Sequence, residues 1–313
     1  MRNLRKKLTL CICFFLLLGL GVVAQRQESD LSDLVLVLDP GHGDRSCGQI
    51  LADPGAVVQS DSGPISECVL TWDTALRLKQ LVEQRGGKVF LTLENSNEDK
   101  PSDWPPNSIP KPGTSDFSYR ALVSNPNPRS EWETLQARVD EANSVFRTWS
   151  WTHDVYFISL HFDSTSPDLA GISFYYPTWC KEPGFRRVLE DTIRKSHRAR
   201  RDLRTGQERG LSQPGRYAIL SHSENYDAYL VELANLRSED SQGGNPDLWR
   251  ARSAEGRQAY AELLLEALVN RPEPSPDSWK FRQRASLKKV CLLAFVLLSL
   301  VIWRLRRSRR QAS

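Results

Sequence analysis

Residues 34–43 read LVLVLDPGHG and contain the clearest indication of how the chain folds. The first five residues are an uninterrupted apolar run of strand length, which is typical of a strand that other elements cover on both faces. The Asp-Pro-Gly that follows predicts a turn. We therefore expect a buried strand of a parallel sheet, with a polar loop at its carboxyl end.

Apolar runs of strand length alternate with segments of helical periodicity along most of the chain. Such alternation predicts an α/β fold, with a mainly parallel twisted sheet flanked by helices in a single domain. Residues 94–131 contain seven prolines and are expected to form a long loop insertion. The expected strands are 34–38, 88–93, 155–160, 171–176 and 228–233, and the expected helices are 67–85, 132–146, 182–197 and 248–269.

The charge of the chain is distributed unevenly. The 313 residues carry a net charge of +4, but the first seven residues hold four basic side chains and residues 282–310 hold nine. Residues 8–281 therefore carry a net charge of −9. A nucleic-acid-binding protein concentrates positive charge on its folded domain, so nucleic acid is not an expected partner.

The basic ends of the chain adjoin its two long apolar runs. Residues 8–24 follow a cationic start, and we interpret residues 1–24 as a signal peptide or an N-terminal membrane anchor. The second run, 290–303, lies between basic residues and predicts a C-terminal transmembrane segment at 288–305. A buried C-terminal helix is the alternative interpretation of this second run.

These segments predict how the protein is arranged at a membrane. Residues 271–287 form the expected linker from the domain, and the basic tail 306–313 is expected on the cytoplasmic side. We therefore expect a membrane-anchored protein whose central domain lies outside the cytoplasm, on the periplasmic or cell-wall side.

Four side chains at the expected strand ends and helix starts suggest a metal site. His42 and His161 follow two of the strands, Glu232 lies in the last strand, and Glu67 opens the first helix. Two imidazoles and a carboxylate make a three-ligand zinc set with an open position, and a further carboxylate can serve as a general base. Each residue alone has a simpler explanation, such as a structural histidine or a glutamate that complements a helix dipole.

Taken as a set, several motifs resemble the type-3 N-acetylmuramoyl-L-alanine amidase family of zinc-dependent peptidoglycan hydrolases. The resemblance covers about residues 34–270, which it identifies as a zinc amidase catalytic domain. It places His42, Glu67 and His161 at the zinc ligands and Glu232 at the catalytic glutamate. The motifs are LVLVLDPGHG (34–43), Glu67 at a helix start, LQARVDEANSVF (135–146), DVYFISLHFDS (154–164), GISFYY (171–176), QERGL (207–211) and YLVELANLRSED (229–240).

The resemblance implies hydrolysis of the amide between N-acetylmuramic acid and L-alanine, with peptidoglycan as the substrate. A protein activator and the terminal membrane contacts complete the expected partners. Two alternatives stay open at this stage. One is a catalytically inactive module of the same fold that binds peptidoglycan or signals, and the other is a zinc amidohydrolase or peptidase that acts on a different amide.

Two cysteines lie beside residues that the resemblance assigns to zinc. Cys47 follows His42 by five residues, and Cys68 follows Glu67 directly. If both neighbours bind one ion, their loops converge, so we expect a Cys47–Cys68 disulfide. Two separate buried thiols are the alternative.

Overall fold

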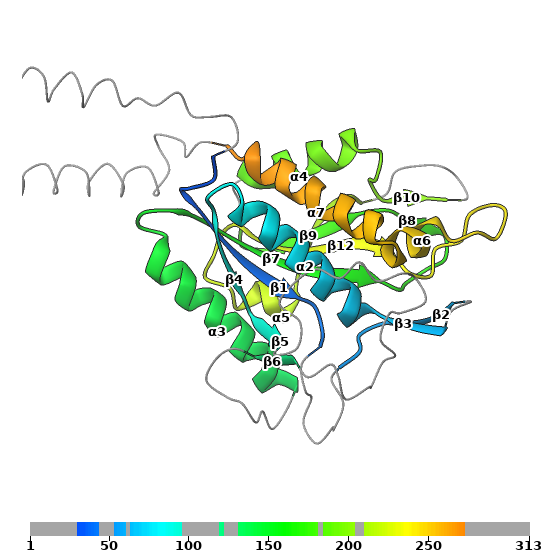
Figure 1. Ribbon diagram of the computed structural model, residues 1–313, viewed down its shortest axis with the longest axis horizontal. Helices are drawn as coiled ribbons and strands as arrows, with labels where there is room; N and C mark the ends of the chain where they lie inside the picture. Colours follow the sequence, from blue (N-terminus) through cyan, green and yellow to red (C-terminus); the bar gives the residue numbers. More distant parts are fainter. Residues whose placement is uncertain are drawn as a thin grey trace, which may run out of the picture.

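The computed structural model describes residues 30–43, 53–60, 63–95, 119–121, 131–180, 184–203 and 210–272. Within these residues a central six-stranded sheet lies between two layers of helices. Helices α2, α4, α6 and α7 pack on one face of the sheet and α3 and α5 on the other (Figure 1). The predicted α/β architecture is therefore confirmed.

The sheet is mixed, although most of its strand pairs are parallel. Its order is β11-β9-β12-β7-β1-β4. Strands β4, β1, β7 and β12 run parallel, β9 is antiparallel to β12, and β11 is parallel to β9. The bounds of the six strands are β1 Leu34–Pro40, β4 Lys88–Leu91, β7 Asp154–Asp163, β9 Ser173–Pro177, β11 Ser212–Gly215 and β12 Ala228–Asn235.

Three of the predicted helices lie close to their expected positions, the short helix at 218–221 was not predicted, and the last predicted helix is divided. We expected one helix over residues 248–269, but the structure has two, because the chain is extended at Ser253 and its side chain accepts a hydrogen bond from Gly256 N at 3.0 Å. The bounds are α2 Glu67–Glu83, α3 Glu131–Trp149, α4 Gly184–Lys195, α5 Ala218–Ser221, α6 Pro246–Arg252 and α7 Ala254–Val269.

Three small two-stranded sheets accompany the main sheet. The β2–β3 hairpin directly precedes α2, and β5 pairs with β6 inside the proline-rich insertion. The sequence did not predict these short strands, because runs of two to four residues have no clear periodicity. Their bounds are β2 Val57–Ser60, β3 Gly63–Ser66, β5 Leu93–Asn95, β6 Tyr119–Ala121, β8 Leu169–Ala170 and β10 Arg201–Asp202.

Strand β1 contributes to two hydrophobic cores at once. Leu34, Leu36 and Leu38 belong to the larger core, under α2, α4 and α7. Val35 and Val37 belong to the smaller core, under α3 and α5. Because successive side chains of a strand point to opposite faces, a strand buried on both faces needs apolar residues at every position. This explains the uninterrupted run LVLVL.

The predicted terminal segments lie outside the described residues. These are the signal peptide or anchor at 1–24, the transmembrane segment at 288–305 and the tail at 306–313, and the linker 271–287 is described only at its first two residues. In the part of the chain that the structure describes, no helix has both the length and the apolar character needed to span a membrane. The terminal membrane segments therefore remain predictions.

Candidate metal centre

The loop after β1 brings His42 to the end of β7. Gly41 N donates a hydrogen bond to Leu160 O at 2.8 Å, and a Cβ on Gly41 would lie 2.5 Å from both this oxygen and His161 Cε1. Glycine is therefore required where the two strand ends meet. His42 has a φ of 62°, in the left-handed region that few non-glycine residues occupy. This conformation and the contact with β7 position the imidazole beside His161.

A buried ion pair between Asp39 and Arg138 holds this loop in place. Asp39, the last polar residue of β1, accepts hydrogen bonds from Arg138 Nε at 2.8 Å and from the hydroxyls of Thr92 and Ser159 at 2.5 Å each. Arg138 comes from α3 and also donates to the backbone oxygens of Pro40 and His42. The guanidinium therefore joins α3 to the backbone on both sides of the turn.

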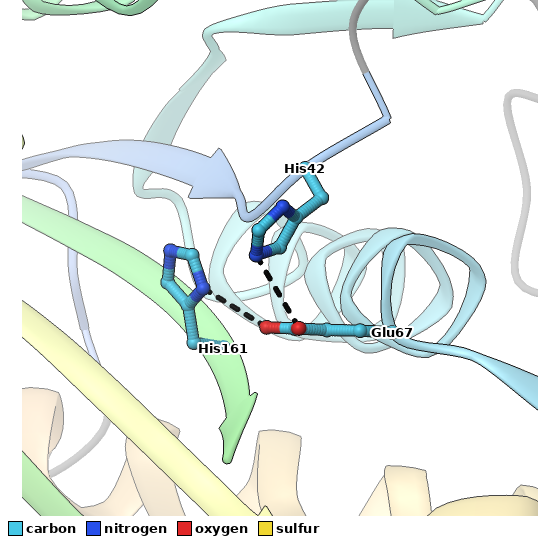
Figure 2. Close-up of side chains that lie close together, drawn as sticks. All are labelled: His42, Glu67 and His161. Atoms are coloured by element: carbon cyan, nitrogen blue, oxygen red, sulfur yellow. Dashed lines mark hydrogen bonds and ion pairs between the residues drawn. The ribbon is translucent and has the colours of Figure 1, made fainter. Parts of the chain in front are cut away.

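Glu67, the first residue of α2, connects the two histidines. Its Oε1 lies 2.9 Å from His161 Nδ1, and its Oε2 lies 3.3 Å from His42 Nε2 (Figure 2). The backbone N–H groups of Phe162 and Ala56 donate to the same carboxylate at 3.0 and 2.9 Å. The three side chains that the sequence analysis grouped therefore lie close together in the structure.

The three side chains fit a divalent metal ion of the zinc type. One donor atom from each of His42, Glu67 and His161 lies within 4.8 Å of the others. Two imidazoles and one carboxylate are a common protein ligand set for catalytic zinc. The backbone of Gly55 packs directly against this group, because a Cβ there would lie only 2.6 to 2.7 Å from atoms of His42 and Glu67.

The ionisation of Glu67 agrees with a role as ligand. Burial by itself raises the pKa of this carboxyl, but the hydrogen bond from His161 and the charges of His161 and His42 outweigh burial and lower the pKa below its ordinary value. The carboxylate is therefore ionised at neutral pH, which is the form that binds a metal ion.

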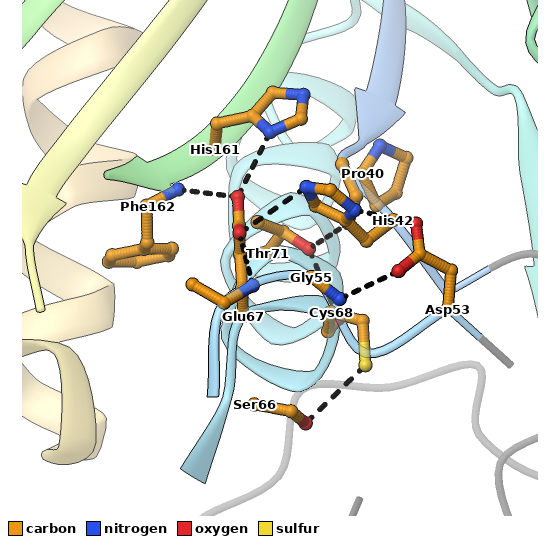
Figure 3. Close-up of polar contacts among 12 residues, drawn as sticks. Pro40, His42, Asp53, Gly55, Ser66, Glu67, Cys68, Thr71, His161 and Phe162 are labelled. Atoms are coloured by element: carbon orange, nitrogen blue, oxygen red, sulfur yellow. Dashed lines mark hydrogen bonds and ion pairs between the residues drawn. The ribbon is translucent and has the colours of Figure 1, made fainter. Parts of the chain in front are cut away.

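Asp53 also belongs to the site, although no pattern in the sequence led us to expect it. Its Oδ2 lies 2.7 Å from His42 Nδ1, and its Oδ1 accepts a hydrogen bond from Gly55 N at 3.0 Å (Figure 3). A signal was present in the sequence, because residues 53–55 repeat the Asp-Pro-Gly of residues 39–41.

Glu232 lies on the strand next to His161. In the parallel pair of β7 and β12 its Cα is in register with that of His161, so both side chains lie on the same face of the sheet. Its Oε2 is buried and has no hydrogen-bond partner among the described residues. Burial and the charges of Glu67 and Asp163 raise the pKa of Glu232 well above its ordinary value.

A cavity of about 220 Å³ opens beside two of the candidate ligands, His42 and His161, on the α3 and α5 side of the sheet. His42 and His161 line one part of it, and Arg138, Leu135 and Tyr217 line others. A small molecule in the cavity can therefore contact the imidazoles of His42 and His161. The cavity and the polar side chains therefore lie together at the carboxyl edge of the sheet.

The structure gives Cys68 as a free, buried thiol. Its Sγ lies 3.4 Å from Ser66 Oγ (Figure 3), and burial raises the pKa of the thiol to about 12. The partner expected for it, Cys47, lies outside the described residues. The structure therefore gives no support to the expected disulfide.

The fold and the site together define an α/β domain with a candidate metal centre at the carboxyl edge of its sheet. The model of the N-acetylmuramoyl-L-alanine amidase family matches residues 36–270. The chain therefore belongs to this family, and the enzyme class implied by the sequence resemblance, a peptidoglycan amidase, is confirmed.

Two solved structures have a similar fold. The N-acetylmuramyl-L-alanine amidase Ami1 of Mycobacterium smegmatis is 22% identical, with a TM-score of 0.50 over 76% of this chain and 96% of that one. The apo form of Ami1 from Mycobacterium abscessus is 20% identical, with a TM-score of 0.51 over 76% of this chain and 98% of that one. At such identities the likeness shows the fold. No curated protein matches the chain.

Proposed function

We propose that this protein hydrolyses the amide between N-acetylmuramic acid and the L-alanine of the peptidoglycan stem peptide, and that the reaction depends on zinc. The observation that carries the proposal is the convergence of donor atoms from His42, Glu67 and His161 within 4.8 Å at the edge of the sheet. Glu232, on the neighbouring strand, supplies a fourth side chain to the same place.

His42, Glu67 and His161 are the residues that would hold the metal ion. When bound, zinc lowers the pKa of water from 15.7 to about 7 and polarises the carbonyl of a substrate. The protein holds the ligands in place through the contacts of Asp53 with His42 and of two backbone N–H groups with Glu67. Such outer contacts fix the orientation of each ligand before metal arrives.

Glu232 is the proposed general base. Its buried Oε2 has no partner within the described part of the chain, so it is available to accept a proton. Once ionised, a carboxylate whose pKa is raised by burial is a stronger base than an exposed one. In the reaction the water oxygen bonds to the lactyl carbonyl carbon while Glu232 accepts the water proton. Glu232 then passes the proton to the alanine nitrogen as the carbon–nitrogen bond breaks.

Digestion of purified cell wall tests the proposal. Mass spectrometry of the soluble products is expected to show free stem peptides that begin with L-alanine, whereas the Glu232→Gln variant is expected to release them about 10²- to 10⁴-fold more slowly. Wall that is bound but not cut by the wild type would instead support an inactive binding module. Cleavage of another amide would identify a different amidohydrolase.

We also propose that the domain acts outside the cytoplasm, anchored to the membrane by the terminal apolar runs. The support is the basic flank of residues 8–24, the basic flanks of residues 290–303 and the acidic charge between them. Protease added to intact spheroplasts is expected to digest the domain and to spare the tail 306–313. Protection of the domain would contradict this location.

A further inference from the structure

A second hollow, of about 820 Å³, shares no lining residue with the cavity beside His42 and His161. The β2 strand forms one wall, and the loop after β12 and helix α6 form the opposite wall. In Figure 1 the hairpin β2–β3 and α6 lie at the same end of the molecule, toward which β7 and β12 point. We call this hollow the α6 groove.

The α6 groove begins close to the candidate metal centre along three chain segments. Val57 follows Ala56, whose N–H donates to Glu67 at 2.9 Å. Thr165 and Leu236 lie four residues beyond His161 and Glu232 respectively, and both line the groove. Four residues span at most about 14 Å, so the near end of the groove lies within about 14 Å of the candidate catalytic side chains.

The charge of the groove is opposite to that of the domain around it. Arg237 and Arg252 line the groove together with one acidic residue, Glu239, whereas residues 8–281 as a whole are strongly acidic. Arg237 is exposed, and its guanidinium has no ion-pair partner among the described residues. A locally basic hollow on an acidic surface is complementary to an anionic ligand.

The rim of the groove carries an exposed tryptophan. Trp249, in α6, is 69% exposed, more than any other large hydrophobic residue that the structure describes. A flat, rigid side chain of this kind supplies contact area to a ligand at small entropic cost. The ligand that suits the α6 groove therefore combines carboxylates with apolar segments.

We propose that the α6 groove binds the stem peptide of the substrate through its free carboxylates, with Arg237 as the anchoring cation and Trp249 as an apolar wall. This inference rests on the proposed function, because the stem peptide begins at the amide that is cut. A stem peptide of four residues extends up to about 14 Å from that amide, which is enough to reach a groove that begins within about 14 Å of His161 and Glu232. Its glutamate and its carboxyl terminus supply the negative charges.

Binding of a free peptide tests the inference without any turnover. Isothermal titration of the full-length protein in detergent uses L-Ala-γ-D-Glu-L-Lys and the same peptide with both free carboxyls amidated. The wild type is expected to bind the acidic peptide at least about fivefold more tightly, since each exposed charge pair contributes modestly. Arg237→Gln is expected to remove this preference, and Trp249→Ala to weaken both peptides.

Two matched variants serve as controls. Arg187→Gln changes an exposed arginine of α4, and Trp132→Ala changes a tryptophan of α3 that is 49% exposed, and neither residue lines the groove. Both are expected to bind as the wild type does. Equal binding of the two peptides by the wild type, or unchanged binding by Arg237→Gln, would overturn the inference. Binding of an N-acetylglucosamine oligosaccharide that Trp249→Ala abolishes would assign the groove to the glycan strand instead.

The result is independent of the cell-wall assay. Peptide binding that depends on Arg237 supports the groove even if no wall is cut, and that outcome would contradict only the proposed hydrolysis. If the wall is cut but Arg237→Gln leaves both peptide binding and KM unchanged, the hydrolysis stands and the groove assignment fails.

Discussion

Asp53 Oδ2 lies 2.7 Å from Nδ1 of His42, while Nε2 of the same ring lies 3.3 Å from Glu67. A carboxylate can only accept a hydrogen bond, so Nδ1 of His42 donates to Asp53. Asp53 therefore fixes the ring in the orientation in which Nε2 faces the other two candidate ligands. Burial raises the pKa of Asp53, but the hydrogen bond from His42 and the positive charges of His42 and Arg138 outweigh burial and lower this pKa below its ordinary value.

Replacing Asp53 by alanine is expected to weaken zinc binding by about 10- to 100-fold, because His42 loses the partner that fixes its ring orientation. Competition with a chromogenic chelator measures the affinity of the full-length protein. Asp191→Ala, at an exposed position of α4, is the control and is expected to bind zinc normally. An Asp53→Ala variant with wild-type affinity would show that the loop alone orients His42.

The full-length protein is expected to bind one zinc ion per chain, and His42→Ala and His161→Ala are each expected to lose it. The physical reason is that an open zinc site needs three protein ligands, and either substitution leaves two. Elemental analysis after gel filtration measures the stoichiometry. His153→Ala, which removes a histidine on the loop before β7, is expected to retain the ion. Stoichiometric zinc in either of the first two variants would remove that histidine from the ligand set.

Glu232→Gln is expected to keep zinc and the fold but to lower the rate of amide cleavage by about 10²- to 10⁴-fold. The amide has nearly the shape of the carboxyl group but cannot accept the proton of water. Release of stem peptides from purified wall measures the rate, and zinc content together with circular dichroism reports on the site and the fold. A rate near that of the wild type would mean that another residue is the base.

The sequence predicted the candidate ligands because each of them sits at a strong local signal. His42 follows a buried strand and an Asp-Pro-Gly turn, and Glu67 begins a helix with clear periodicity. His161 directly follows the apolar run of another strand. Parallel strands bring their carboxyl ends to one edge of the sheet, so residues far apart in the chain could be grouped from the order of the strands alone.

The features that escaped prediction depend on contacts that no periodic pattern in the sequence records. The link from Arg138 to Asp39 spans 99 residues and leaves no local pattern. Asp53 lies in a segment without regular secondary structure. Its hydrogen bond with His42 can be seen only in the folded chain, where Gly55 packs against the His42 ring. The division of the last helix at Ser253 also escaped, because the apolar periodicity continues across the cap.

The buried pair of Asp39 and Arg138 supports the last prediction, which concerns stability. Its two side chains are 2% and 5% exposed. Removing Arg138 therefore leaves the Asp39 carboxylate buried without an opposite charge. Arg138→Met is therefore expected to lower the free energy of unfolding by about 3 to 5 kcal/mol. Urea denaturation with excess zinc, and again with a chelator, measures this loss separately from any loss of metal.

Helix α3 also supplies the matched control for this experiment. Arg147 pairs with Glu224 at 2.7 Å, but there the side chains are 58% and 47% exposed. Water already solvates both groups, so Arg147→Met is expected to cost less than about 1 kcal/mol. The two variants make the same chemical change in one helix, and they differ in burial and in the contacts of Arg138 with the His42 loop. Equal losses would show that neither difference matters and that Asp39 is solvated in the absence of Arg138.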